Sequence, residues 1–153
     1  MTFEFLTSEN VDKYIEYLNI AMAQEPDMMC SDRIDEVALK KRLEDSLYKN
    51  TPSILALDGD KVVGRIEYHF YGCLQDGYRM AYVDWIYVLS EFRHKGIARQ
   101  LFGEFEKECI KNKIDQYYLI RSTESNADRF YRSFENAELG DEPILRKMIV
   151  KEG

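Results

Sequence analysis

The chain has 153 residues, of which 45% are hydrophobic and 32% charged, and its formal net charge at pH 7 is −7. This length and composition are typical of one globular domain that buries its own core, so we expect a single domain over residues 1–153. The negative charge argues against a nucleic-acid-binding protein and favours cationic partners or substrates.

The sequence also lacks the marks of membrane insertion and export. No apolar run approaches the roughly 20 residues of a membrane span, and the N-terminus has no basic segment followed by an apolar signal region. The cysteines, Cys30, Cys73 and Cys109, are scattered and odd in number, which suggests neither a disulfide framework nor a metal site. We therefore expect a cytoplasmic protein that binds no membrane and no metal.

The first half of the sequence begins with a predicted strand and two predicted helices. Residues 2–6 alternate between polar and apolar side chains, as a strand does. Thr7 or Ser8 then caps a helix that Pro26 ends, and a second helix extends over residues 34–48. Apolar residues at helical spacing are Val11, Tyr14, Ile15, Leu18 and Met22 in the first helix and Leu39, Leu43 and Leu47 in the second.

A loop and a hairpin complete the first half. In the loop, residues 24–33, Met28 and Met29 either pack beneath the chain or cover a pocket. Residues 53–57 and 62–71 predict two antiparallel strands, joined by a turn that contains Gly59.

Residues 82–112 predict a buried strand, a basic turn and a long amphipathic helix. The strand has β-branched and aromatic residues on both faces, and Asp84 is its only charged residue. In the helix, apolar side chains recur every four residues at Ile97, Leu101 and Phe105. We therefore expect this helix to cover a sheet with one face.

The turn in this stretch has the composition of an anion site. It reads Arg93, His94, Lys95, Gly96, Ile97 and Ala98. A glycine lets backbone approach a ligand closely, and the first turn of a helix leaves several N–H groups unpaired. These donors and the basic side chains suit a phosphate, although a solvated turn whose charges face water is the alternative.

The remaining sequence predicts a short strand at residues 116–121, a helix that begins at Ser125 or Asn126 and ends near Asn136, and a last strand at residues 144–150. The stretch between the helix and the last strand is short for a further strand. That strand is therefore incomplete, or a partner subunit of a homodimer completes the edge of the sheet.

Two motifs in the second half resemble those of the GNAT family of N-acetyltransferases. Arg93, Gly96 and Ala98, after a strand that ends in Val88, are similar to its acyl-CoA-binding motif. Residues 126–131, Asn-Ala-Asp-Arg-Phe-Tyr, are similar to the helix that closes its cofactor site. The element order matches too, and the resemblance implies an α/β (α+β) fold with a mixed, strongly bent sheet and helices on both faces.

The resemblance also implies acetyl-CoA as the co-substrate. Its pyrophosphate would lie on the backbone N–H groups of residues 94–98, with charge added by Arg93 and Lys95. Its pantetheine arm would pair like an added strand with the backbone near Ile86, Tyr87 and Val88, where an N–H would polarise the thioester carbonyl. On the later helix, Asn126 and Arg129 would reach the cofactor.

Two residues are implicated in the chemistry. The resemblance makes Tyr131 the acid for the departing thiolate, since a phenol and a thiol have comparable basicity, although a packed aromatic is the alternative. Asp84, on the strand face of Ile86 and Val88 by alternation, resembles a glutamate that accepts the amine proton in some GNAT enzymes. Three roles are open for Asp84: it acts as that base, it binds a cationic acceptor, or it forms a salt bridge with a residue such as Arg65.

His69, in a strand of mixed character, is expected to be structural. The function expected from the resemblance is transfer of an acetyl group from acetyl-CoA to a primary amine of a small molecule or peptide, directly within a ternary complex. The alternative is a non-catalytic acyl-CoA-binding sensor or interaction domain. The acceptor is an amine, with a cationic one favoured by the acidic chain, and its identity stays open.

Overall fold

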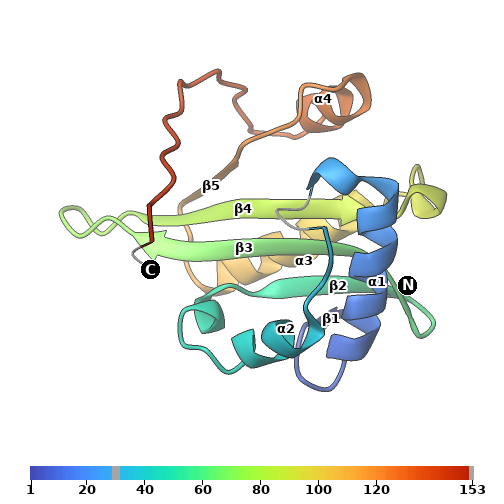
Figure 1. The fold of residues 1–153 in the computed structure, drawn as a ribbon. Helices are drawn as coiled ribbons and strands as arrows, with labels where there is room; N and C mark the ends of the chain where they lie inside the picture. The colour runs from blue at the N-terminus through green and yellow to red at the C-terminus, as the bar shows by residue number, and fades with distance from the viewer. Residues whose placement is uncertain (29–31, 152–153) are drawn as a thin grey trace. The chain divides into compact units, whose positions relative to one another are not determined.

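The computed structural model describes residues 1–28 and 32–151. It contains two compact units, Met1–Ile120 and Arg121–Gly153. The first unit holds the β-sheet and helices α1 to α3, and the second holds helix α4 (Figure 1).

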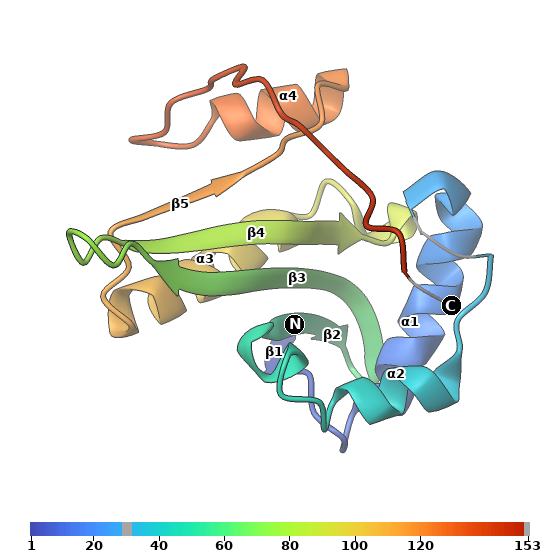
Figure 2. The ribbon, with the colours of Figure 1, turned by 60° about the vertical axis from the view of Figure 1, so that its left-hand side comes forward.

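The sheet of the first unit is mixed. Its strands are β1 (Thr2–Phe5), β2 (Ser53–Asp58), β3 (Lys61–Gly72), β4 (Arg79–Val88) and β5 (Gln116–Leu119). They lie in the order β1-β2-β3-β4-β5, with every pair antiparallel except β4 and β5, which are parallel. Figure 2 shows the strong curvature of β3. The predicted mixed, bent sheet is confirmed.

Helices α1 (Val11–Gln24) and α3 (Ile97–Lys111) cover opposite faces of this sheet (Figure 1). Consecutive residues of β3 demonstrate it, because neighbours in a strand point to opposite faces. The Arg65 guanidinium lies 5.0 Å from the centre of the Tyr14 ring of α1. The adjacent Gly64 faces α3, since a Cβ there would lie 3.2 Å from a Leu101 methyl group.

The core fills the space between the sheet and these helices. On the side of α1 it is formed mainly by aliphatic residues of β2 and β3 with the inner face of the helix, and Leu39 of α2 (Glu36–Arg42) joins it. On the side of α3, Tyr68 of β3 packs on Phe105 with ring centres 4.8 Å apart. The predicted apolar faces of both long helices are therefore the faces that the structure buries.

Two predicted helix boundaries in the first unit are wrong. The residue at the start of α1 is Asn10, not Thr7 or Ser8, and its amide accepts from Thr7 N and donates to Phe5 O, both at 2.9 Å. The second helix ends at Arg42, not near residue 48, because the Leu47 side chain lies 71% exposed and gives the last turns no core to pack against.

The predicted loop after α1 contains a 3₁₀ turn, Pro26–Met28, in which Met28 is exposed, and the prediction for Met29 lies outside the described residues.

The second unit contains α4 (Ser125–Arg132), which Glu124 caps by accepting from the N–H groups of Asn126 and Ala127. The helix ends before the predicted Asn136. Residues 133–151 contain no strand, so the strand predicted at 144–150 is wrong in this structure. A strand needs a neighbour for its backbone hydrogen bonds, and the apolar side chains of this segment are exposed among the described residues.

The packing at Gly64 supports a prediction about stability. The Cβ of a substituted residue would meet Leu101 and Val88 at 3.2 Å and Ile97 at 3.5 Å. Gly64→Val should therefore lower the free energy of unfolding by about 1–3 kcal/mol, measured by urea denaturation, because the α3 interface is overpacked.

Gly103 provides the matched control. It lies within α3, and no described atom lies within 4 Å of the position that its Cβ would take. Gly103→Ala should raise stability by about 0.5–1 kcal/mol through its better helix propensity. Equal effects at the two glycines would contradict the close packing of Gly64.

Candidate active site

Strand β4 changes its partners midway along its length. It pairs with β5 only from Met80 to Val83, whereas its pairing with β3 continues to Val88. No other described strand lies on the β5 side of residues 84–88, so this edge of β4 is available for pairing in the first unit. Such an edge suits an extended ligand.

A bulge marks the point where β5 leaves. Glu67 of β3 pairs with Trp85 and Tyr68 pairs with Val83, so Asp84 is an extra residue on β4. The bulge places Asp84 on the face of Glu67 and His69, opposite the face that alternation predicts.

The predicted common face of Asp84, Ile86 and Val88 is therefore wrong. Simple alternation ignores the extra residue, which shifts every following side chain by one position.

The bulge brings Asp84 to His69. The Asp84 Oδ2 and His69 Nε2 atoms are 2.8 Å apart, and the His69 Nδ1 lies 3.3 Å from the Thr51 Oγ1. The three side chains line a pocket of about 490 Å³, together with Glu67, Asn50 and the aromatic residues Tyr48 and Phe70. The pocket therefore meets the available edge of β4 at a single shared residue, Asp84.

Arg65 is not the partner of Asp84, contrary to one sequence alternative. It is buried on the α1 side of the sheet, where its guanidinium lies 4.8 Å from the centre of the Trp85 ring and donates to the Tyr14 hydroxyl. Its nearest described carboxylate is Glu67, at 3.8 Å.

Glu67 is the carboxyl group with the perturbed acidity in this pocket. Burial raises its pKa from 4.5 to about 6, and the negative charge of Asp84 acts in the same direction, while Arg65 opposes both. Ser53 donates weakly to it, at 3.5 Å. Glu67 therefore binds its proton more tightly than an ordinary exposed glutamate does.

The turn before α3 has the backbone of an anion site. His94 and Gly96 both have positive φ, 61° and 79°. Gly96 is the N-cap of α3, and no side chain of the described residues caps it. Gln100 N donates to Gly96 O and closes the first helical turn, which leaves the amides of Ile97 and Ala98 without an intrahelical acceptor. Such alternating conformations make a concave set of N–H donors.

The basic side chains of the turn point in different directions. Arg93 Nε donates to Val88 O at 3.0 Å, and its guanidinium lies 5.0 Å from the centre of the Tyr87 ring. Lys95 lies 5.1 Å from the centre of the Phe92 ring, and the His94 side chain is exposed. Arg93 thus ties the turn to the end of β4.

The C-terminal end of α1 also holds this region in place, which sequence reasoning missed. The Gln24 Oε1 accepts from the Tyr87 hydroxyl and from Ser90 N, and the Gln24 Nε2 donates to Glu91. Glu25 lies 3.9 Å from Arg93. No local pattern marks these contacts, because they join positions more than sixty residues apart in sequence.

Two of the three residues predicted to pair with pantetheine have carbonyl oxygens that accept from side chains of the same chain. Tyr87 O accepts from the buried Tyr17 hydroxyl at 2.9 Å, and Val88 O accepts from Arg93. Ile86 pairs with Ile66 of β3. The hydrogen bond from Tyr17, like those of Gln24, is a contact that the sequence did not indicate.

In the second unit, Tyr131 packs against Phe130 and Phe134, with ring centres 5.3 and 5.8 Å away. Burial raises the pKa of its phenol, so the hydroxyl stays protonated at neutral pH. Asn126 and Arg129, on the same helix, have exposed side chains. Asp128, which lies on the same helix, forms ion pairs with Arg121 and Arg132.

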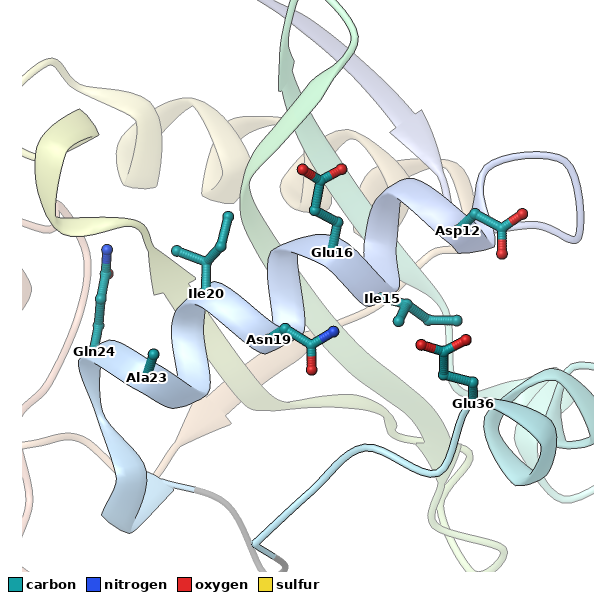
Figure 3. A pocket seen from close by; sticks show the side chains of 8 residues that line it. All are labelled: Asp12, Ile15, Glu16, Asn19, Ile20, Ala23, Gln24 and Glu36. Atoms are coloured by element: carbon teal, nitrogen blue, oxygen red, sulfur yellow. The ribbon is translucent and has the colours of Figure 1, made fainter.

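A wider hollow of about 710 Å³ lies along α1 (Figure 3). Its lining is acidic at Asp12, Glu16 and Glu36 and apolar at Ile15 and Ile20. Of these, Asp12 is paired with Lys40 at 2.8 Å. Neither the β4 bulge nor the α3 turn contributes to this hollow, so it lacks the groups that mark the smaller pocket.

The described residues contain no cluster of three or more His, Cys, Asp or Glu side chains that could hold a metal ion. Within the same part of the chain, every helix is too short or too polar to cross a membrane.

Comparison with known proteins identifies similar chains. The sequence model of the acetyltransferase (GNAT) family matches residues 14–135. No curated protein sequence matches the chain. A solved aminoglycoside acetyltransferase from an uncultured soil metagenomic sample, in complex with sisomicin, has a TM-score of 0.79 at 19% identity over 96% of this chain and 95% of its own.

A ribosomal-protein-alanine N-acetyltransferase from Brucella melitensis biovar Abortus 2308 has a TM-score of 0.73 at 19% identity, over 96% of this chain and 100% of its own. At these identities the likeness shows a shared fold.

The raised pKa of Glu67 predicts a pH-dependent stability. The folded protein binds this proton more tightly than the unfolded chain, so its stability falls as pH rises from 4.5 to about 6. Glu67→Gln, which cannot ionise, should be more stable than the wild type at pH 7.5 by up to about 2 kcal/mol, with no gain at pH 4.

Urea denaturation at both pH values measures this difference. The exposed Glu44 supplies the control, since Glu44→Gln removes the same charge from a surface position. A gain in stability at pH 7.5 that equals that of the control would contradict the buried environment of Glu67.

Proposed function

The chain belongs to the GNAT family of acetyltransferases, and we propose that it transfers an acetyl group from acetyl-CoA directly to a primary amine of a small molecule or peptide. The observation that carries the proposal is the edge of β4. It begins at Asp84 beside a polar pocket and ends at Val88, from which a short connection leads to the uncapped N-terminus of α3. The end of β4 thus lies between a pocket that suits an amine, beside Asp84, and a helix N-terminus that suits a phosphate, at the start of α3.

The residues present fit acetyl-CoA, which supplies the acetyl group as a thioester when it is bound. The N–H groups at the start of α3 and the left-handed residues His94 and Gly96 form the donors for the pyrophosphate. Lys95 adds positive charge, and Arg93 positions the turn on β4. Residues 86–88 supply the strand edge, and Asn126 and Arg129 of α4 are proposed to reach the cofactor.

The proposed acceptor pocket suits an amine because it contains two carboxyl groups, Asp84 and Glu67. The names of the two similar enzymes support this class, since one is an aminoglycoside acetyltransferase and the other a ribosomal-protein-alanine N-acetyltransferase. Asp84 is proposed to take part in removing the proton of the amine, and Tyr131 in protonating the thiolate. Cytoplasmic location and a homodimer stay predictions.

Release of free thiol from acetyl-CoA in the presence of a panel of amines tests the function. The panel should include polyamines, aminoglycosides, amino acids and peptides with free N-termini. Amine-dependent thiol release with a matching acetylated product supports the enzyme. Binding of acetyl-CoA without amine-dependent release would favour an acyl-CoA sensor.

Gly96→Glu should abolish binding of CoA measured by calorimetry, because its carboxylate would occupy the space that the pyrophosphate requires. Gly77→Glu controls for strain and charge, since Gly77 also has positive φ, 72°, and no described atom lies within 4 Å of the position of its Cβ. Gly96→Gln, which has the same size without the charge, separates repulsion from steric exclusion. Unchanged affinity in Gly96→Glu would remove the turn as the phosphate site.

Tyr131→Phe should lower kcat by about 100-fold or more with little change in the KM for acetyl-CoA, because the variant keeps the ring and loses the proton donor. Tyr78→Phe removes an exposed hydroxyl from the loop between β3 and β4 and serves as the control. Steady-state kinetics at saturating amine measure both variants. Wild-type turnover in Tyr131→Phe would assign the residue to packing.

A further inference from the structure

The pocket beside β4 contains a chain of three hydrogen-bonding groups from separate segments. Thr51 precedes β2, His69 belongs to β3, and Asp84 is the bulged residue of β4. The two contacts that join them, 3.3 Å from Thr51 Oγ1 to His69 Nδ1 and 2.8 Å from His69 Nε2 to Asp84 Oδ2, use both nitrogens of the ring. His69 is therefore held between a hydroxyl and a carboxylate.

The carboxylate determines the tautomer of the ring. An ionised carboxylate only accepts hydrogen bonds, so the proton of a neutral His69 lies on Nε2, which faces Asp84. The lone pair of Nδ1 then faces Thr51, whose hydroxyl donates to it. This leaves the lone pairs of the Thr51 oxygen to accept a hydrogen bond from another molecule in the pocket.

We propose that Thr51, His69 and Asp84 form a relay that removes the proton of the acceptor ammonium group. This inference rests on the proposed acetyl transfer. An N–H bond of the ammonium breaks, and its proton passes to Thr51 Oγ1 as the hydroxyl proton passes to His69 Nδ1. The resulting imidazolium is stabilised by Asp84 and later releases its proton to water. The nitrogen keeps the electron pair of the broken N–H bond and forms the new amide bond with it, while the C–S bond of the thioester breaks and its electron pair leaves with the thiolate.

The relay explains why His69 is better placed than Asp84 to receive the proton. The lone pair of its Nδ1 faces the Thr51 hydroxyl in the pocket, whereas the Oδ2 of Asp84 already accepts from His69 Nε2. Asp84 then acts as a positioning residue, which fixes the tautomer of the ring and balances its charge.

The surroundings of the ring favour a cationic acceptor. Besides Thr51, the groups that face His69 are Asp84 and the Tyr82 ring from β4 and Glu67 from its own strand. Tyr48 and Phe70 add aromatic faces to the same pocket. Carboxylates attract an ammonium group and aromatic faces accept a cation, so the pocket should select acceptors that are charged before the reaction.

His69→Gln tests the relay. Glutamine can still donate to Asp84 but cannot carry the proton, so kcat/KM for the amine should fall by about 100-fold or more at pH 7. The acidic limb of the pH–rate profile should also be lost. His94→Gln is the matched control, since His94 is the only other histidine of the sequence. It should keep the acidic limb whatever its effect on the KM for acetyl-CoA.

The relay also predicts how the other two members behave. Thr51→Val should lower kcat/KM, whereas Thr51→Ser, which keeps the hydroxyl, should retain it. The double variant Asp84→Asn with His69→Gln should lose no more activity than His69→Gln alone, because the residues act as one unit. In His69→Ala, added imidazole should restore part of the rate. Thermal melts of each variant verify that it is folded.

Nitrogen NMR of the ring provides a readout that does not depend on activity. The wild type should show His69 as the Nε2–H tautomer, and Asp84→Asn should change the tautomer ratio. An unchanged ratio, additive losses in the double variant, or wild-type kcat/KM in His69→Gln would each overturn the relay while acetyl transfer by the wild type still stands. Failure of the wild type to acetylate any amine would instead overturn the proposed function, and the relay with it.

Discussion

The extra residue in β4 is the constraint on which the rest of the site depends. Up to Val83 the strand has hydrogen-bonded neighbours on both sides, and after it only β3 remains. The bulge turns Asp84 toward His69 and at the same place begins the edge that an extended ligand can use. The β-bulge at Asp84 therefore positions both the proposed acceptor pocket and the strand edge that is proposed to bind the cofactor.

Much of the fold could be predicted from the sequence, since the strongest signals were periodic. The end of α3 and the strands of the β2–β3 hairpin lie within one residue of their predicted bounds, and the apolar repeat of α1 is the face that the structure buries. The predictions failed where the packing of a segment, and not its local pattern, decides its structure. Leu43 still packs against the core, but Leu47 lies exposed, so the predicted last turns of the second helix do not form. The described apolar residues after Pro143 are exposed and form no strand.

Less of the site could be predicted, for a related reason. The glycine at position 96 was evident because a glycine between basic residues and an amphipathic helix suits the close approach of backbone to an anion. The bulge left no mark on the pattern of β4, so the face of Asp84 was assigned wrongly. Thr51, His69, Tyr17 and Gln24 gained their roles from contacts across the sheet or between elements, and polar residues of these kinds are common everywhere in sequences.

The hydrogen bonds of Gln24 restrict how α1 can change in length. One residue inserted or deleted within the helix would rotate the side chains after it by about 100°. The amide would then turn away from Tyr87, Ser90 and Glu91, and the end of β4 would lose its support. We therefore expect relatives that keep this contact to differ along α1 by substitution alone, on a helix whose length is fixed.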